Sequence, residues 1–353
     1  MHIAVIGAGV VGCTTALSLS ARGARVTVLE SSVPGAEASS AAAGILGAQA
    51  ELRGDDRSHA GMLVRARDGW ADWAKQLREA SGIDVGHRVS GVLRIARTEG
   101  ELEKERREVE WHRGQGLRAE LLDGQAAHAV EPELSTDACG AALFADDAQV
   151  DPPALLRALM AALARTPAVT VRSGTTVERL LVERDRCRGV RLDGGDLGAD
   201  ATVLAAGSWS SLVPGVPASV PAVRPVRGQL VLLDERPPRV RSIVFGAGGY
   251  VVPRGDGRVL CGSTTEYAGF RKEVTAGGVH AILATALACV PSLADAQLSA
   301  TWSNFRPHAE GGHPLAGASP LEGLFLATGH YRNGILLSKL TADEVAEAVL
   351  RSS

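Results

Sequence analysis

Hydrophobic and polar positions over the first thirty residues fall into blocks with a clear order. Residues His2 to Ile6 form a short apolar run that predicts a buried parallel strand. Residues 10–22 have the pattern of a helix, and Arg25 to Leu29 form a second apolar run. The order of strand, helix and strand predicts a βαβ unit at the start of the chain.

A glycine motif joins the first strand to the first helix. Residues Gly7-Ala8-Gly9-Val10-Val11-Gly12 match G-x-G-x-x-G, and Glu30 follows 18 residues after Gly12. Gly7 permits the tight turn, Gly9 lets a pyrophosphate approach the backbone, and Gly12 lets helix and strand pack closely. A carboxylate at position 30 can accept hydrogen bonds from ribose hydroxyls and disfavours a 2′-phosphate. These features predict dinucleotide binding and leave NAD and FAD open.

The middle of the chain alternates between helical and extended patterns. An apolar stripe predicts one helix over residues 59–80. Thr98 and Glu101 have the spacing of a capping box and open a charged helix over residues 99–113. Further elements are a helix that starts at Pro152-Pro153 and strands at 168–172, 175–183, 188–192 and 201–205.

From residue 223 the pattern changes to short extended runs separated by Gly, Pro and Asp. The predicted strands are 229–233, 243–245, 249–253 and 258–262. Such runs indicate an antiparallel sheet. A strand at 324–327 and a helix from 334 to about 350 then return the chain to the first sheet.

Composition narrows the class of protein. The chain has 353 residues, 45% of them hydrophobic, and a formal net charge of -3, so we expect no nucleic-acid partner. It has no apolar run long enough for a membrane span, so we expect no membrane association. Its first residues do not combine a basic segment with an apolar one, so we expect no signal peptide. Five scattered cysteines without a C-x-x-C pair predict reduced thiols in the cytoplasm.

Several motifs spread along the chain give a more specific indication. Taken alone, the small residues 38–46 suit either a ligand-lining loop or a surface linker. In chain order the motifs are the Gly7–Gly12 turn with Glu30, Ser39–Leu46 with Gln49-Ala50-Glu51, Gln149–Pro152, Ala205–Ser210, Tyr250–Arg254, Trp302 with Arg306-Pro307, and Gly329–Leu337. Together they resemble the D-amino acid oxidase family of flavoproteins, and most of all its glycine oxidases of the thiamine pathway.

The resemblance implies an α/β fold and a cofactor. The fold would be an FAD-binding Rossmann-like (doubly wound) domain with an inserted α+β substrate domain built on an antiparallel sheet. The FAD-binding domain would comprise residues 1–85, 140–222 and 318–353, and the substrate-binding domain residues 86–139 and 223–317. FAD would be held without a covalent bond, since residues 302–306 contain no cysteine.

The resemblance also implies which residues meet the cofactor. The glycine turn would bind the pyrophosphate, and Glu30 would bind the adenosine ribose. The backbone of Val177 would contact the adenine end of the cofactor. A helix that starts near Gly334 would direct its positive end toward the flavin. The expected cofactor residues are Gly7, Gly9, Val10, Val11, Gly12, Glu30, Ser31, Ser39, Ser40, Ala43, Gly44, Ile45, Val177, Gly207, His330, Tyr331, Arg332, Asn333, Gly334, Ile335 and Leu336.

Three residues are candidates for the substrate side. Arg306 matches the arginine that binds the substrate carboxylate in the family. Tyr250 matches the tyrosine that donates a hydrogen bond to the same carboxylate. Arg332 either faces the flavin pocket or caps a surface carboxylate. We expect no metal, because His308, Glu310 and His313 have no further ligand nearby in the sequence.

The implied reaction is oxidative deamination of glycine or another small amino acid, with dioxygen as acceptor and glyoxylate, ammonia and hydrogen peroxide as products. Alternatives are a sarcosine or other D- or N-methyl amino acid oxidase or dehydrogenase, a nicotinamide enzyme, and a non-catalytic flavin subunit. Ser39–Leu46 and Gly329–Gly334 argue against the nicotinamide enzyme, and Arg306 with Tyr250 argues against the subunit. Relatives imply a homo-oligomer.

Overall fold

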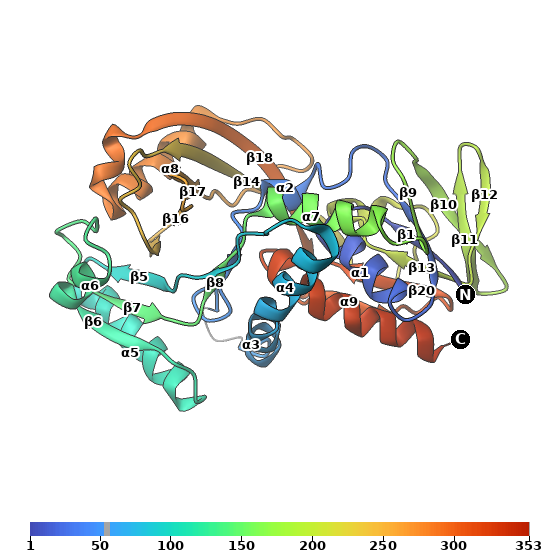
Figure 1. Cartoon of the computed structure of the whole chain (residues 1–353), viewed down its shortest axis with the longest axis horizontal. Coiled ribbons are helices and arrows are strands. Elements are labelled where there is room, and N and C mark those ends of the chain that lie inside the picture. Colours follow the sequence, from blue (N-terminus) through green and yellow to red (C-terminus); the bar gives the residue numbers. More distant parts are fainter. Residues whose placement is uncertain (53–56, 353) are drawn as a thin grey trace.

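The computed structural model describes residues 1–52 and 57–352, and within them the strands form two large and two small sheets (Figure 1). The first large sheet, here called the first sheet, has the order β19-β20-β13-β1-β2-β9. Its pairs are parallel except for β19 with β20. The strands are β1 (His2–Ile6), β2 (Arg25–Leu29), β9 (Val169–Arg172), β13 (Ala201–Leu204), β19 (Leu315–Ala318) and β20 (Leu324–Thr328). This confirms the predicted parallel βαβ unit.

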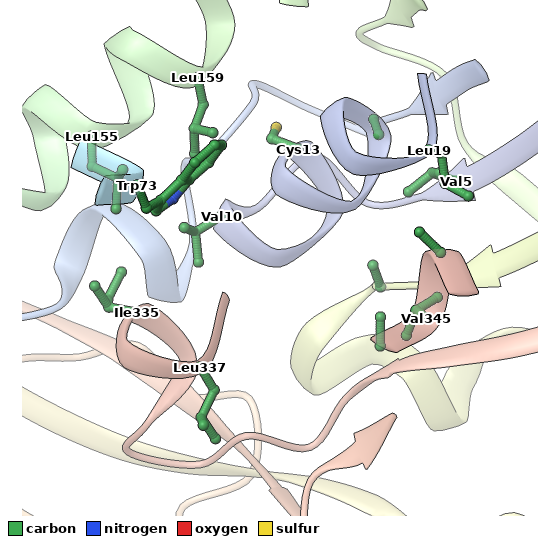
Figure 2. Packing of buried hydrophobic residues seen from close by; sticks show 14 of the residues in the cluster. Val5, Val10, Cys13, Leu19, Trp73, Leu155, Leu159, Ile335, Leu337 and Val345 are labelled. Atoms are coloured by element: carbon green, nitrogen blue, oxygen red, sulfur yellow. The ribbon is translucent and has the colours of Figure 1, made fainter. Parts of the chain in front are cut away.

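Helices from both ends and the middle of the chain pack against one another beside the first sheet. They are α1 (Val10–Ser20), α7 (Pro152–Ala164) and α9 (Gly334–Arg351). Figure 2 shows Val10 and Cys13 of α1, Leu155 and Leu159 of α7, and Ile335, Leu337 and Val345 of α9 in one core with Trp73. Burial of these side chains holds the N-terminal glycine turn and the C-terminal helix in one unit.

The second large sheet, here called the second sheet, lies on the other side of the molecule (Figure 1). Its order is β18-β14-β17-β16-β15-β5-β7-β6. The strands are β5 (Val92–Ala96), β6 (Glu120–Asp123), β7 (Gly140–Phe144), β14 (Val223–Asp234), β15 (Ile243–Gly246), β16 (Gly249–Pro253), β17 (Arg258–Gly262) and β18 (Gln297–Ala309). It is antiparallel as predicted, except that β15 pairs with β5 in parallel.

The sheets depart from the expected domain boundaries at two places. Strand β7 begins at Gly140, which we assigned to the first domain, but it pairs with β5 and β6 in the second sheet. Strand β19 starts at Leu315, before the expected boundary at 318, and pairs with β20 in the first sheet. Both shifts follow from long-range pairing, which the local pattern of residues does not reveal.

The prediction of one helix over residues 59–80 is wrong. The structure has α3 (Ala60–Asp68) and α4 (Trp70–Ser81), separated at Gly69. Trp70 is buried, and its indole Nε1 donates to the carbonyl oxygen of Leu336 at 2.9 Å. Glycine has a low helix propensity, so a break at this position lets the second helix turn its tryptophan toward α9.

The charged helix is confirmed as α5 (Glu99–Gly114), with Glu101 N–H donating to Thr98 Oγ1 at 3.2 Å. Glu101 itself accepts from the N–H of Arg97, one residue before the cap. The remaining elements are α2 (Ala38–Ala41), β3 (Ile45–Leu46), β4 (Arg88–Val89), α6 (Gly124–Val130), β8 (Ala148–Gln149), β10 (Val177–Glu183), β11 (Arg186–Leu192), β12 (Gly195–Gly198), η1 (Gly207–Leu212), α8 (Ala276–Cys289) and η2 (Pro291–Asp295).

Two further findings concern the membrane and the thiols. Among the helices of the described residues, none has the length and apolar character needed to cross a lipid bilayer. All five cysteines are free, as the sequence predicted, and Cys13, Cys187, Cys261 and Cys289 are buried.

Candidate active site

A cavity of about 510 Å³ lies between the first and second sheets. The ends of β1, β2 and β13 line one side of it, and residues of β14, β16 and β18 line the other. In open parallel sheets, ligands bind outside the carboxyl ends of the strands, and this cavity occupies that position.

The glycine turn at the end of β1 is shaped by close backbone contacts. Gly7 has φ +104°, and a Cβ there would lie 2.5 Å from the carbonyl oxygen of Ala205. A Cβ on Gly12 would lie 2.0 Å from the carbonyl oxygen of Gly7. Gly9 faces the cavity, and its Cβ would meet only Ser39 Oγ, at 3.2 Å. The first and third glycines therefore build the turn, whereas the second leaves room for a ligand.

Glu30 is fixed at the end of β2 beside this turn. One carboxylate oxygen accepts from the N–H of Ala8 at 3.0 Å, and the other accepts from the N–H of Ser32 at 3.0 Å. Glu30 also lines the cavity, so its remaining lone pairs are available to hydroxyl donors. The first turn of α1 contains no acidic residue, which leaves its positive end open to an anion.

Most of the expected cofactor residues are brought together in this cavity. The lining includes Gly7, Gly9, Val10, Val11, Glu30, Ser31, Ser39, Ala43, Gly44, Ile45, Val177, Gly207, His330, Tyr331, Arg332, Gly334 and Ile335, together with Tyr250 and Arg306.

The expected residues Gly12, Ser40, Asn333 and Leu336 are not part of the lining. Gly12 is packed against Gly7, and Ser40 lines a neighbouring cavity. Leu336 is buried in the core of α9. The N–H of Asn333 is bonded to the carbonyl oxygen of His330 at 2.9 Å, within the turn that precedes α9.

The turn between β20 and α9 is held by backbone geometry and by a buried histidine. Gly329 and Tyr331 have φ +78° and +50°. His330 is buried, and its Nε2 lies 2.9 Å from Thr341 Oγ1 of α9. Burial lowers the pKa of His330 to about 4, so the imidazole is neutral at physiological pH. This histidine fixes the turn.

Arg332 lies in the cavity lining and is paired there with a carboxylate that is mostly buried, not with one on the surface. Its side chain lines the cavity, and its Nε donates to Glu51 Oε2 at 2.7 Å. Glu51 lines the cavity too. The carboxylate of Glu51 raises the pKa of Arg332 above its ordinary value, so the guanidinium stays charged and paired.

Arg306 and Tyr250 extend over the same face of the second sheet. The Arg306 guanidinium lies over Gly228, where a Cβ would be 2.4 Å from Nη1. The Tyr250 ring lies over Gly262, where a Cβ would be 2.8 Å from the hydroxyl oxygen. Arg306 donates to the carbonyl oxygen of Thr264 at 3.1 Å and to Ser263 Oγ at 2.5 Å. Both partners are neutral, and among the described residues no carboxylate lies within ion-pair distance of Arg306.

Sequence reasoning gave no role to several lining residues, including Glu51, Trp209 and Asn304. Glu51 and Trp209 lie in motifs already noted, but no local signal marks their contact with the cavity. Asn304 lies two residues before Arg306 on β18, so the two side chains point to the same face of the sheet. That alternation is the signal that could have identified it.

The cavity fits an FAD cofactor and an acidic substrate. The glycine turn, the open end of α1 and Glu30 suit a dinucleotide, while Arg306 on the opposite wall suits a carboxylate. A site of this kind is typical of a flavoprotein that oxidises small acids or amino acids. The family model of FAD dependent oxidoreductases matches residues 2–348. The chain belongs to this family, and its cofactor is FAD.

Individual relatives agree over nearly the full chain. Glycine oxidase from Geobacillus kaustophilus is 36% identical, covering 99% of this chain and 93% of its own length. Its crystal structure superposes with a TM-score of 0.93, at 35% identity, over 99% of this chain and 95% of that chain. Glycine oxidase from Pseudomonas putida is 32% identical, over 96% of this chain and 91% of the relative.

A further relative is longer than this chain. The bifunctional protein ThiO/ThiG of Trichormus variabilis is 35% identical over 99% of this chain, which covers 52% of that protein. The present chain is therefore similar to one half of it.

Proposed function

We propose that the protein oxidises glycine, and other small amino acids, to the imine. The imine formed from glycine hydrolyses to glyoxylate and ammonia, dioxygen is the acceptor, and hydrogen peroxide is formed. Similarity to the glycine oxidases of two bacteria supports this assignment. Similarity to ThiO/ThiG supports a role in supplying thiamine thiazole synthesis.

The observation that carries the proposal is that Arg306 has no ion-pair partner among the described residues. It lines the cavity, and its hydrogen bonds go to two neutral oxygens. A guanidinium in such a setting binds a carboxylate through two parallel charge-assisted hydrogen bonds. Arg332 is different, because Glu51 already neutralises it. Among the described residues that line the cavity, Arg306 is therefore the arginine available for a substrate carboxylate.

The protein's contribution to the reaction is mainly orientation. Arg306 holds the carboxylate, and the Tyr250 hydroxyl donates a further hydrogen bond to it, so the α-carbon is presented in a fixed pose. FAD held in this cavity would supply the two-electron acceptor for the α-carbon, with dioxygen as the final acceptor. His330 serves as no base, because burial keeps its pKa at about 4 and Thr341 occupies its Nε2. We propose that the substrate amine binds in its neutral form.

We assign the cofactor contacts from the same lining. The glycine turn and the start of α1 would hold the pyrophosphate, and Glu30 the ribose. Residues Ser39 to Ile45 and the turn from His330 to Ile335 would line the flavin. We expect non-covalent attachment, since Trp302 to Arg306 on β18 contain no cysteine.

The two large sheets suggest one domain for the cofactor and one for the substrate. Residues 1–85, 145–222 and 315–353 would carry FAD, and residues 86–144 and 223–314 would carry the substrate. Free, mostly buried thiols support a cytoplasmic protein. The exposed apolar side chains of Tyr267 and Phe270 support contact between copies in a homo-oligomer.

Anaerobic mixing of the purified protein with single amines tests the proposal. Glycine should bleach the visible absorption band of the flavin, and air should restore it with formation of peroxide. Bleaching by sarcosine or D-amino acids but not by glycine would replace the proposed substrate with these. A failure of air to restore the colour would make the protein a dehydrogenase.

A further inference from the structure

Arg254 is a buried arginine that the reaction described above does not use. It follows β16 at the edge of a second cavity of about 470 Å³, and its residue exposure is 7%. Its Nη1 donates to Gln149 Oε1 and its Nη2 to the carbonyl oxygen of Ala43, each at 2.5 Å. Within the described residues no carboxylate pairs with it directly. A charge held this deeply with only neutral partners is costly, and its position calls for an explanation.

The bond to Ala43 fixes the direction of one peptide unit. Ala43 and Gly44 both line the active-site cavity, whereas Arg254 lines only the second cavity. In a planar trans peptide the C=O and the N–H point in opposite directions. Because the Ala43 carbonyl points to Arg254, the Gly44 N–H points away from Arg254, and Gly44 itself lines the active-site cavity.

The Gly44 N–H is also an available donor. No acceptor for it lies among the described residues, although the Gly44 carbonyl oxygen accepts from the N–H of Val150 at 2.9 Å. Gly44 has φ +74°, and a Cβ there would lie 2.2 Å from the carbonyl oxygen of Val150. Arg254 thus holds the Ala43–Gly44 peptide and Val150 holds the peptide that follows it, and the Gly44 N–H is left for a ligand.

We propose that Arg254 is a positioning residue for the cofactor: it holds and polarises the Ala43–Gly44 peptide so that the Gly44 N–H donates to the bound flavin. A cation on the carbonyl oxygen strengthens the N–H on the other side of the same peptide, because hydrogen bonds in a chain polarise one another. The effect is largest when the flavin carries negative charge, which it gains on reduction. The inference rests on the family's cofactor and is independent of the glycine assignment.

The test compares Arg254→Met with Arg88→Met. Arg88 is exposed on β4 and donates to the carbonyl oxygen of Pro253 at 3.1 Å, so its loss removes a nearby charge without touching Ala43. FAD affinity is measured by titrating apoprotein with FAD and following flavin fluorescence. The midpoint potential of the bound flavin is measured by dye equilibration without any amino acid.

Arg254→Met should weaken FAD binding about tenfold or more and make the midpoint potential more negative. Arg254→Lys, which restores a cation, should recover part of the potential shift, and Arg88→Met should leave both quantities near wild type. A purely structural arginine would change the melting temperature but not the potential.

Two results would overturn the proposal. One is an unchanged potential in Arg254→Met, and the other is an equal shift in Arg88→Met. If Arg254→Met does not fold, Arg254→Gln takes its place, since it keeps a neutral donor at this position. An unchanged potential in folded Arg254→Gln would overturn the proposal equally.

Discussion

Glu51 and Arg332 form an ion pair of 2.7 Å across a separation of 281 residues in the chain. Glu51 follows the loop that lines the cofactor cavity, and Arg332 lies in the turn before α9. The pair joins the N-terminal and C-terminal parts of the site and neutralises an arginine of the cavity lining. Under the proposed function, Arg306 is then the cation that would bind the substrate carboxylate.

The charge balance of this pair should be visible in the flavin potential. Glu51→Gln leaves an uncompensated cation in the cavity lining and should make the potential more positive, whereas Arg332→Met leaves an uncompensated carboxylate and should make it more negative. The double variant should lie near wild type. Equal shifts in the same direction for the two single variants, measured by dye equilibration, would contradict this account.

Arg306→Met should raise KM for glycine about 100-fold or more, because two charge-assisted hydrogen bonds to the carboxylate are lost. The flavin spectrum should stay as in wild type. Arg224→Met is the matched control, since Arg224 is exposed on the neighbouring strand β14. Steady-state peroxide production measures the effect, and an unchanged KM in Arg306→Met would remove the carboxylate role.

Tyr250→Phe tests the second carboxylate contact. The ring packs beside Phe245 with centroids 5.7 Å apart, and phenylalanine keeps that packing. Loss of the hydroxyl should raise KM about tenfold, the usual effect of one hydrogen bond to a charged group. The melting temperature should stay close to that of wild type. A variant with unaltered KM would show that the hydroxyl does not reach the substrate.

Gly9→Ala should separate cofactor binding from folding. The added methyl group would face the cavity and contact only Ser39 Oγ, so the fold should persist while FAD binding weakens about tenfold or more. Gly100→Ala on the exposed face of α5 is the control, because its Cβ would meet nothing within 4 Å. Fluorescence titration of the apoproteins with FAD compares them, and equal affinities would argue against pyrophosphate binding at this turn.

His330 should make the protein sensitive to acid. Burial lowers its pKa from 6.5 to about 4, so below pH 6.5 the unfolded chain binds a proton that the folded chain does not. Stability from this residue is therefore present above pH 6.5 and is lost as the pH falls toward 4, by about 3 kcal/mol in total.

Thermal unfolding of the holoprotein from pH 7 to pH 4 checks this expectation. His330→Asn should show a shallower loss of melting temperature over that range than wild type. His280→Asn, at an exposed position on α8, should follow the wild-type curve. If His330→Asn has the same pH slope as wild type, the histidine does not account for the acid sensitivity.

The sequence by itself determined the turns, caps and short strands that are specified by residues close together in the chain. The Gly7–Gly12 turn, the strands beside it and the capped helix α5 all form where the pattern predicts them. A tight turn, a cap or a short apolar strand is specified by residues a few positions apart, so each can be recognised without knowledge of the fold.

Only the tertiary structure decided how distant parts of the site meet. Strand pairing places Gly140–Phe144 in the second sheet, Glu51 reaches Arg332, and Arg254 reaches the Ala43 carbonyl. The sequence contained each of these side chains but not their partners. Such contacts depend on how the two sheets pack around one cavity, and that packing results from the burial of many residues far apart in the chain.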